Sequence, residues 1–329
     1  MINYLEKISG KKILVTGGLG FVGHNLVKTL LNTYKCEVIV VDNCANSSPN
    51  VLGTDIDKVQ FYNISVLDTI QLFPLLHEVN FIFHLACKQI SASGKEALDD
   101  MKVNAESTLN ILEYIKNNSL PLLERFVYTS SCSVYGSSTK LPASESDPTF
   151  VLSNYAATKL LGENYTLIYN KNYDLPTASV RYSNVYGYGQ SPRNPYCGVL
   201  GKFVHNALVQ QPLSVFGDGE QTRDFTFVDN AVQINVKGML TQNTAALNKV
   251  YNVAVGENFS VNYLYKICRE ALQSNWEATY REPRAGDIRN SLADITLAND
   301  LLGYAPTKKF EDGLLETISF FKTLYSNGK

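Results

Sequence analysis

The 329-residue sequence has few of the residues that hold a metal ion or a disulfide framework. It contains only four histidines, which form no HxxxH or HExxH pattern, and six cysteines, which form no CxxC pair. We therefore expect neither a metal site nor a set of structural disulfides. Scattered free thiols are typical of proteins from a reducing compartment, so a cytoplasmic location is expected.

Long apolar runs and an excess of one charge are also missing. No segment approaches the roughly 18 apolar residues of a membrane span, and Met1 to Lys12 contain no apolar core of a signal peptide. The chain has 31 acidic and 29 basic residues, for a net charge of -2. Nucleic-acid binders carry a basic face. The near-neutral charge therefore predicts no nucleic acid among the partners, and the absence of a long apolar run predicts no membrane.

What the sequence does have is a regular alternation of apolar strands and amphipathic helices. The expected strands are residues 12–16, 37–41, 59–62, 81–85, 125–129 and 177–181, and the expected helices are residues 21–32, 103–117 and 154–171. Continuous apolar strands separated by helices indicate a parallel sheet that is covered on both faces. After Tyr186 the elements become shorter and more mixed, which indicates either a loop-rich half or a smaller domain that caps a substrate.

A glycine-rich turn follows the first expected strand. In TGGLGFVG, residues 16–23, the glycines fit both GxGxxG and GxxGxxG. Such a turn lets the backbone approach a pyrophosphate, and the N-terminus of the next helix stabilises the anion. Asp42 ends the second strand, where a carboxylate can accept hydrogen bonds from ribose hydroxyls and would repel a 2′-phosphate. The pattern predicts a Rossmann-type, doubly wound α/β fold that binds NAD rather than NADP, although Asp42 could also be an ordinary helix cap.

Three polar residues form a candidate catalytic group. Tyr155 and Lys159 lie four residues apart on one expected helix, and Ser131 follows the fifth strand at the sheet edge where ligands bind. A tyrosine ordinarily titrates near ~10, and a neighbouring lysine with an oxidised nicotinamide would lower that pKa. The phenolate could then take a proton from a sugar hydroxyl that Ser131 holds, while a hydride leaves for NAD. From the spacing alone, a surface helix with a snorkelling lysine explains the pair better.

Taken together, these elements resemble the extended short-chain dehydrogenase/reductase family, and within it the nucleotide-sugar 4-epimerases. The resemblance is closest to UDP-N-acetylglucosamine 4-epimerases and spans nearly the whole chain. Besides the segments above it includes VDNCANS at 41–47, FHLA at 83–86, SSCSVYG at 130–136, RYSNVYG at 181–187, FGDGEQTRDFTFVDN at 216–230 and PRAGDIRNSLADITLANDLLGYAP at 283–306. The last two are the most specific of these motifs.

By position, the resemblance implies a set of residues for each ligand. NAD would contact Gly17, Gly20, Phe21, Val22, Gly23, Asp42, Asn43, Asn46, Ser47, Asn63, Ile64, Leu85, Ala86, Cys87, Gln89, Asn104, Tyr155, Lys159 and Tyr182. The nucleotide-diphosphate sugar would contact Ser131, Ser133, Asn184, Val199, Arg223, Arg284, Asp287 and Ser291. In this set Arg223 and Arg284 would hold the diphosphate, which suits planar guanidinium groups, and Asp287 would hold a ribose.

The resemblance also implies an organisation in two domains and a homodimer. Residues 1–183, with 221–255 returning to them, would bind NAD, and residues 184–220 with 256–329 would bind the nucleotide sugar. Family members usually pair through the helices expected here at 103–117 and 154–171. The first of these carries apolar residues on more than one side, which is consistent with such burial.

Two positions narrow the reaction. Related dehydratases and decarboxylases usually carry Glu where Ser133 stands, and one branch of the dehydratases adds Asp where Cys132 stands, so these residues argue against both reactions. Ser291 is small enough to leave room for a 2-acetamido group. We expect reversible C4 epimerisation of UDP-N-acetylglucosamine and UDP-N-acetylgalactosamine, with UDP-glucose and UDP-galactose left open. The alternatives are a nucleotide-sugar C4 dehydrogenase, including a GDP-linked one, a UDP-uronic acid 4-epimerase, and a non-catalytic NAD-binding regulatory protein.

Overall fold

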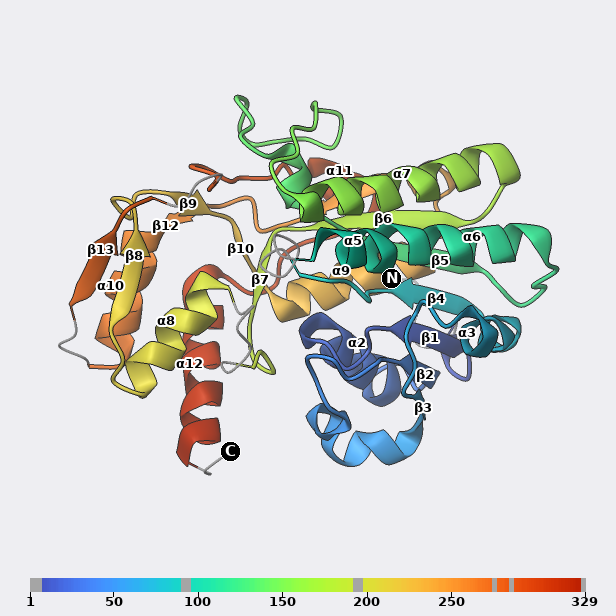
Figure 1. Cartoon of the computed structure of the whole chain (residues 1–329), viewed down its shortest axis with the longest axis horizontal. Coiled ribbons are helices and arrows are strands. Elements are labelled where there is room, and N and C mark those ends of the chain that lie inside the picture. The colour runs from blue at the N-terminus through green and yellow to red at the C-terminus, as the bar shows by residue number, and fades with distance from the viewer. Residues whose placement is uncertain (1–7, 90–95, 192–197, 274–276, 284–286, 327–329) are drawn as a thin grey trace.

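The computed structural model describes residues 8–89, 96–191, 198–273, 277–283 and 287–326. Within these ranges, seven parallel strands form one sheet in the order β11-β6-β5-β4-β1-β2-β3 (Figure 1). The strands are β1 Lys12–Thr16, β2 Glu37–Val41, β3 Val59–Tyr62, β4 Phe81–His84, β5 Arg125–Ser131, β6 Thr177–Tyr182 and β11 Val250–Val253. The order 3-2-1-4-5-6 confirms the predicted Rossmann-type doubly wound sheet.

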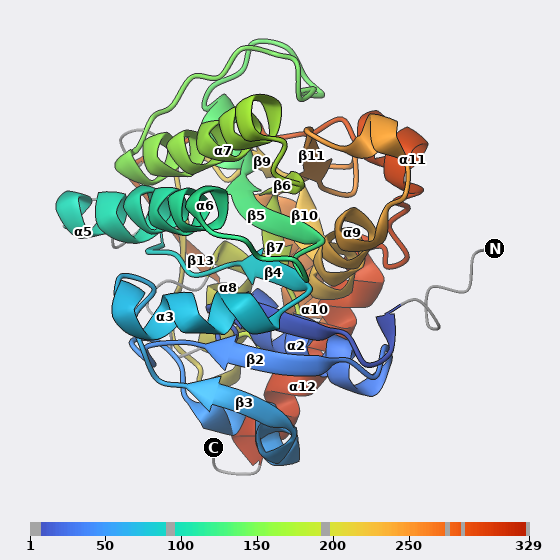
Figure 2. The same cartoon turned by 90° about the vertical axis from the view of Figure 1, so that its right-hand side faces the viewer.

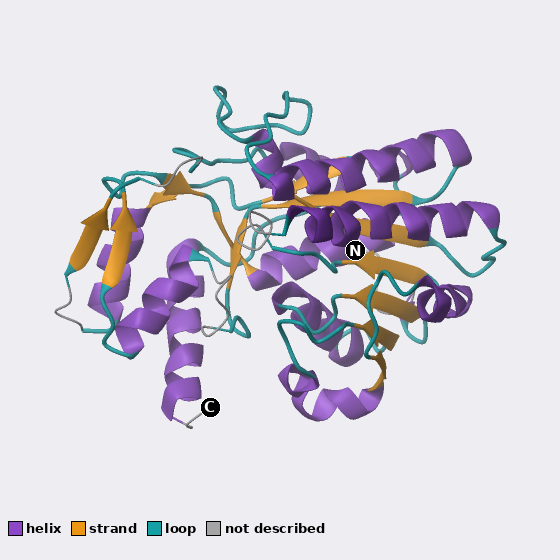
Figure 3. Cartoon of the chain, in the orientation of Figure 1, coloured by secondary structure: helices purple, strands orange, loops and turns teal. Residues whose placement is uncertain are grey.

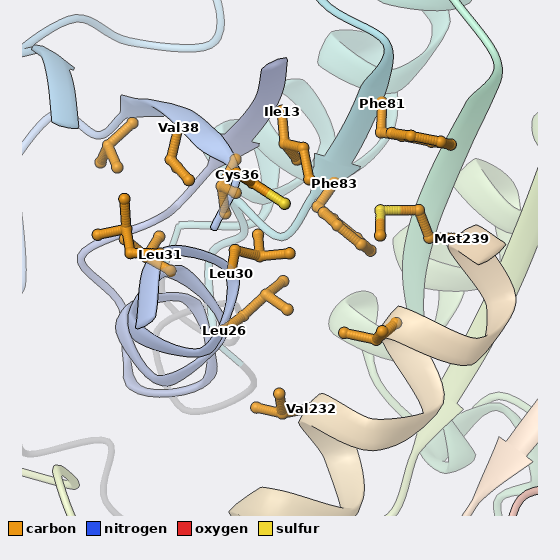
Figure 4. Close-up of a cluster of buried hydrophobic side chains, with 14 of the residues drawn as sticks. Ile13, Leu26, Leu30, Leu31, Cys36, Val38, Phe81, Phe83, Val232 and Met239 are labelled. Carbon is orange, nitrogen blue, oxygen red and sulfur yellow. The ribbon is translucent and has the colours of Figure 1, made fainter. Parts of the chain in front are cut away.

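Both faces of the sheet are covered by helices (Figure 2). One face carries α2 Phe21–Asn32 and α9 Val228–Leu240, and the other carries α3 Thr69–Leu75, α6 Ser107–Asn117 and α7 Asn154–Tyr173. Side chains of β1 alternate between the two layers, because Ile13 and Val15 join the core under α2 and α9 while Leu14 joins the core under α6. Figure 4 shows Ile13 beside Phe83, with Leu26 of α2 and Met239 of α9 in the same core. Each such buried side chain contributes about 1.5–3 kcal/mol to stability.

The strands next to the candidate site end later than their apolar runs predict. The strands expected at 125–129 and 177–181 continue to Ser131 and Tyr182, because Ser130 and Ser131 pair in register with Arg181 and Tyr182. Polar side chains in these last positions are compatible with pairing, since their backbone groups still bond across the sheet. The strand expected at 81–85 ends one residue earlier, at His84.

The helix expected at 103–117 begins earlier than predicted. A short helix α5, Ala97–Met101, continues through a π turn at Lys102–Glu106 into α6. The apolar pattern could not indicate this start, because α5 exposes Leu98 and the apolar side chains that pack on the sheet begin further along. Wide turns of this kind often mark functional sites. The helix expected at 154–171 extends to Tyr173. The residue that follows it, Asp174, has a left-handed conformation and terminates the helix.

A smaller group of elements lies at one end of the sheet, at the left of Figure 3. It contains α8 Val199–Leu208, β8 Leu213–Phe216, α10 Val261–Ala271, β13 Ala278–Arg281 and α12 Phe310–Ser326. Phe225, Phe227 and Phe310 are buried at its centre, and the Tyr186 hydroxyl donates to the Phe310 carbonyl oxygen at 2.8 Å. The expected smaller C-terminal part is therefore present. The limits proposed for the two domains remain a prediction.

The remaining elements are short. They are β7 Asn184–Tyr186, β9 Thr222–Arg223, β10 Phe225–Phe227, β12 Phe259–Ser260 and α11 Thr296–Leu302, together with 3-10 turns at Pro49–Lys58, Leu76–Glu78, Cys132–Tyr135 and Thr244–Ala246. β7 pairs with β10, and β9 pairs with β12. In the described ranges no helix has the length and the apolar character needed to span a membrane.

Candidate active site

The glycine turn between β1 and α2 presents bare backbone to the carboxyl edge of the sheet. Gly17 has a φ of +67°, and a Cβ on it would lie 2.7 Å from the Ala86 nitrogen. A Cβ on Gly23 would overlap the Gly17 carbonyl oxygen. A side chain at either position would therefore push the turn, α2 and the β4 loop apart. Because α2 begins at Phe21, its N-terminal amide groups face the same edge, as pyrophosphate binding requires.

A cavity of about 830 Å³ lies at this edge. It is lined by most of the residues predicted to hold NAD, namely Gly17, Gly20, Phe21, Val22, Gly23, Asp42, Asn43, Asn46, Ser47, Ile64, Leu85, Ala86, Cys87, Gln89, Tyr155, Lys159 and Tyr182. Its size falls within the roughly 300–1,000 Å³ of ligand pockets. Segments from distant parts of the chain thus meet around one space.

Asp42 lies at the end of β2, against the glycine turn. Its carboxylate accepts hydrogen bonds from the backbone N–H of Leu19 at 3.1 Å and of Cys44 at 2.9 Å, and from the Ser47 hydroxyl at 3.4 Å. It therefore orders both loops, but it does not cap a helix, because α2 and the 3-10 turn at Pro49–Lys58 are preceded by Gly20 and Ser48. A carboxylate has four acceptor positions, so Asp42 also retains capacity for a ribose hydroxyl.

Two of the predicted NAD contacts do not line the cavity. Asn63 is exposed just beyond β3. Asn104 is buried in the π turn, where its side chain accepts from the Lys88 backbone N–H at 2.7 Å and donates to the Lys88 carbonyl oxygen at 3.2 Å. Asn104 thereby holds the loop that carries Cys87 and Gln89, so it acts from behind the cavity.

The structure brings the predicted catalytic residues together. Tyr155 and Lys159 line the cavity from α7, and Ser131 at the end of β5 lies close enough to Tyr155 to influence its pKa. Ser131 Oγ accepts from the Ser133 backbone N–H at 3.1 Å. Burial is the largest influence on the pKa of Tyr155 and raises it well above the ordinary value, while Ser131 acts in the opposite direction. Burial lowers the pKa of Lys159.

The direction for Tyr155 differs from the expectation that Lys159 lowers the phenol pKa. Desolvation disfavours the phenolate, and Cys87, Asp100 and Tyr182 act in the same direction, while Ser131 favours it. The phenol is therefore protonated at neutral pH in the protein alone, and ionisation needs additional positive charge beside the ring. An oxidised nicotinamide carries such a charge.

Apart from Ser131, the predicted substrate residues in the described part of the chain lie away from this cavity. Asp287 lines a second cavity of about 460 Å³, together with Phe216, Gly217, Asp218, Gln221, Arg281, Glu282, Pro283, Ile288 and Arg289. Arg223 forms an ion pair with Asp287 at 2.6 Å, and the Ser291 N–H donates to the Thr222 carbonyl oxygen at 3.2 Å. Arg223, Asp287 and Ser291 thus belong to one neighbourhood beside β9. Arg284 lies outside the described residues.

The other predicted substrate residues are spread over three elements. Ser133 lies in the turn after β5, and its buried hydroxyl has no hydrogen-bond partner among the described residues. Asn184 is exposed on β7, and its amide donates to the Asp224 carbonyl oxygen at 3.3 Å. Val199 begins α8. The structure does not bring these three side chains into either cavity.

The sequence analysis does not predict several of the residues that line the large cavity. They are Leu19, His24, Val41, Cys44, Ala45, Ser48, Val51, Ser65, Val66, Lys88, Glu96, Val103, Thr129, Ser130, Gly189 and Ser191. Ser130 is the most informative, because its buried hydroxyl has no partner among the described residues. The serine cluster that points to Ser131 could have indicated it. Lys88 and Glu96 form an ion pair at the cavity, which no local pattern predicts.

The residues present fit NAD and no metal. The bare glycine turn, Asp42 and the buried Ser130 hydroxyl provide groups for a pyrophosphate, a ribose and a further polar atom. No group of three or more His, Cys, Asp or Glu side chains in the described part of the chain is arranged to hold a metal ion. A dinucleotide is therefore the ligand that this cavity suits best.

Comparison with known proteins identifies the class. The model of the NAD dependent epimerase/dehydratase family matches residues 13–254. The chain belongs to this family. The match confirms the predicted family, the prediction that the chain is an enzyme, and NAD as its cofactor.

Particular relatives differ in the sugar that they use. The UDP-glucose 4-epimerase of Mycolicibacterium smegmatis is 34% identical over 94% of this chain and 98% of that protein. The structure of the UDP-N-acetylglucosamine 4-epimerase of Methanobrevibacter ruminantium, in complex with UDP-N-acetylmuramic acid, is 31% identical, has a TM-score of 0.89 and covers 96% of this chain and 100% of that chain. The structure of the UDP-glucuronic acid 4-epimerase of Bacillus cereus with UDP-glucuronic acid and NAD is 30% identical, with a TM-score of 0.86 over 95% of this chain and 100% of that chain. UDP-glucuronic acid decarboxylases of Arabidopsis thaliana are 31–32% identical.

Proposed function

We propose that this chain is an NAD-dependent UDP-sugar 4-epimerase, and that UDP-N-acetylglucosamine and UDP-N-acetylgalactosamine are its preferred pair. The observation that carries the proposal is that Tyr155 and Lys159 line the same cavity as the glycine turn and Asp42, with Ser131 close enough to Tyr155 to lower its pKa. A proton acceptor and a dinucleotide site in one space are what alcohol oxidation requires. The 4-epimerase names of several relatives support the same reaction.

In the proposed mechanism, Ser131 holds the sugar oxygen at C4 and Tyr155 takes its proton. Lys159 favours the phenolate by its charge, against the desolvation that raises the pKa of Tyr155. NAD, held by the glycine turn and Asp42, supplies reversible hydride transfer. The 4-keto sugar must turn over before Tyr155 returns the proton, which gives the opposite configuration at C4.

One side chain supports the choice of sugar, and two others support the choice of reaction. Ser291 is a small residue in the segment that also carries Asp287, so a bulkier substituent at C2 meets less obstruction there. Cys132 and Ser133 follow Ser131 and supply no carboxylate, so neither can serve as the acid for water loss. The positions predicted for diphosphate and ribose contacts, Arg223 and Asp287, form the ion pair beside the second cavity.

One experiment tests the proposal. Purified protein is incubated without added cofactor with UDP-, GDP-, CDP- and dTDP-linked sugars, and the anomeric protons are followed by NMR. Conversion of UDP-N-acetylglucosamine to the galacto product, without net NADH, is the expected result. A 4-keto sugar that accumulates with NADH would identify a dehydrogenase, and a pentose product from UDP-glucuronic acid would identify a decarboxylase. Either result would overturn the proposal.

We also propose that the protein is a homodimer that pairs through α6 and α7. Leu161 and Ile168 on α7 are exposed, with 38% and 44% of their surface accessible. Pairing would remove these apolar side chains from water. Light scattering should give a mass of about 73 kDa, twice that of the 36.6 kDa chain. A mass near that of one chain would contradict it.

A further inference from the structure

The side chain of Lys159 lies on the face of an aromatic ring. Its nitrogen is 4.7 Å from the centre of the Tyr128 ring, and both residues are buried, with 2% and 1% of their surface exposed. The nearest carboxylate along α7, that of Glu163, forms its ion pair with Arg181 instead. A buried ammonium group needs compensation for its lost hydration, and the negative face of an aromatic ring provides it.

Tyr128 is held in one position from several sides. Its hydroxyl lies 3.3 Å from the carbonyl oxygens of both Asn104 and Lys159 and can donate to either. Gly162 faces the same hydroxyl across the interface of α7 and β5, and a Cβ at that position would overlap it. The ring therefore cannot move away from Lys159 without breaking contacts to the π turn and to α7.

We propose that Tyr128 is a positioning residue whose ring face keeps Lys159 charged and aimed at the place where Tyr155 meets its substrate. Tyr128 lies three residues before Ser131 on β5, so one strand places both the oxygen-binding serine and the support for the lysine. The part that concerns catalysis rests on the proposed function, whereas the effect of the ring on Lys159 does not.

Other groups around Lys159 also affect its pKa or its charge interactions. Burial lowers the pKa of Lys159, while Cys87 after β4, Asp100 on α5 and Glu163 on α7 act in the opposite direction. His84 on β4 is uncharged at neutral pH, because burial lowers its pKa to about 3. Tyr155, one turn before Lys159, is protonated in the protein alone because burial raises its pKa. Loss of the ring's attraction should therefore make the lysine lose its proton more readily.

Fluorination of the ring tests this contact without changing its shape. Tyr128 is replaced by phenylalanine and by phenylalanine analogues with one, two or three ring fluorines, which withdraw electron density from the ring face. The lysine side chains are isotopically labelled, the Lys159 signal is assigned by its loss in Lys159→Arg, and its titration midpoint is followed by NMR. We expect Tyr128→Phe to stay close to the native midpoint. The midpoint should then fall stepwise with fluorine number, by ~1 pH unit in total, which corresponds to about 1.4 kcal/mol.

A role of Tyr128 in packing alone predicts a different result. Fluorine barely changes the volume of the ring, so packing would give the same Lys159 midpoint in the whole series, and this result would overturn the inference. As a second measurement, the alkaline limb of the kcat/KM profile should move to lower pH in the same order. If the native protein epimerises no UDP-sugar, the proposed function fails while the NMR titration still decides the role of Tyr128.

Discussion

The guanidinium group of Arg223 lies 2.6 Å from a carboxylate oxygen of Asp287, although the sequence predicts that these residues contact different parts of the substrate. Arg223 is the more buried of the two, with 14% of its side chain exposed against 38% for Asp287. Burial lowers the pKa of Arg223, and Asp287 counteracts this effect. The ion pair therefore keeps a partly desolvated cation oriented beside Asp287, which lines the second cavity.

A first prediction concerns this arginine. In Arg223→Lys the KM for the UDP-sugar should rise about tenfold or more, with a smaller change in kcat. A lysine cannot make the paired, planar hydrogen bonds that suit a diphosphate. Titration calorimetry with UDP alone should show the same loss of affinity. Arg269→Lys on α10, which lines neither cavity, is the matched control and should bind UDP normally. Equal binding by both variants would argue against a diphosphate role for Arg223.

The second prediction concerns the proposed base. Tyr155→Phe should lower kcat at least about 100-fold, because proton transfer by a positioned side chain contributes roughly 10²–10⁴ to a rate. The NAD content, measured after denaturation, should stay close to that of the native enzyme. Tyr165→Phe removes a hydroxyl from the same helix without touching the cavity and should stay fully active. Epimerisation at a near-normal rate in Tyr155→Phe would exclude this residue as the base.

The acidic residue at the end of β2 gives a third prediction. Asp42→Ser should weaken NAD binding by about tenfold and reduce the discrimination against NADP, since the carboxylate no longer meets the ribose hydroxyls or repels a 2′-phosphate. Fluorescence or calorimetric titration of cofactor-free protein measures both affinities. Asp57→Asn removes a charge from a nearby exposed position and serves as the control. If Asp42→Ser kept the native preference for NAD over NADP, the role of Asp42 would be limited to its hydrogen bonds with the N–H groups of Leu19 and Cys44.

The sequence predicts those parts of the site that depend on short local patterns. The glycine turn, Asp42, and the spacing of Tyr155 and Lys159 each follow from a strand end or a helix turn, and the structure assembles them around one cavity. The end of β5 is harder to predict, because Ser130 and Ser131 continue the strand only through pairing with β6. The apolar run of β5 does not reveal how far the neighbouring strand β6 extends.

Contacts between distant segments cannot be predicted in this way. Arg181 donates to the Tyr135 hydroxyl at 2.7 Å, which donates to Asn252 Oδ1 at 2.7 Å. The Asn252 amide in turn donates to the carbonyl oxygens of Ala143 and Asp294 at 3.0 and 2.9 Å. This chain of hydrogen bonds joins the turn after Ser131 to the segment with Ser291. Each residue alone fits an ordinary strand or loop, and only the folded chain shows that they form one network.

A further prediction follows from His84, which is buried between β1 and α6. Its Nδ1 lies 2.8 Å from Thr16 Oγ1 and its Nε2 lies 3.2 Å from Ser107 Oγ. Ser107 donates its own proton to the Val103 carbonyl oxygen at 2.6 Å. Ser107 must therefore accept from Nε2–H, which leaves Nδ1 as the acceptor for Thr16. Protonation of Nδ1 would break this arrangement, so the imidazole is required in its neutral form.

The neutral form of His84 makes stability depend on pH in a defined direction. Burial lowers its pKa from 6.5 to about 3, so between these values the unfolded chain binds a proton that the folded chain does not. The free energy of unfolding should therefore fall as the pH drops below 6.5. In His84→Gln this contribution is absent, so the stability difference between native protein and variant should shrink by about 2 kcal/mol from pH 7 to pH 5. Urea titrations at both pH values measure it. His77→Gln, at an exposed position, should change little. A constant difference for His84→Gln would mean that folding does not change the pKa of His84.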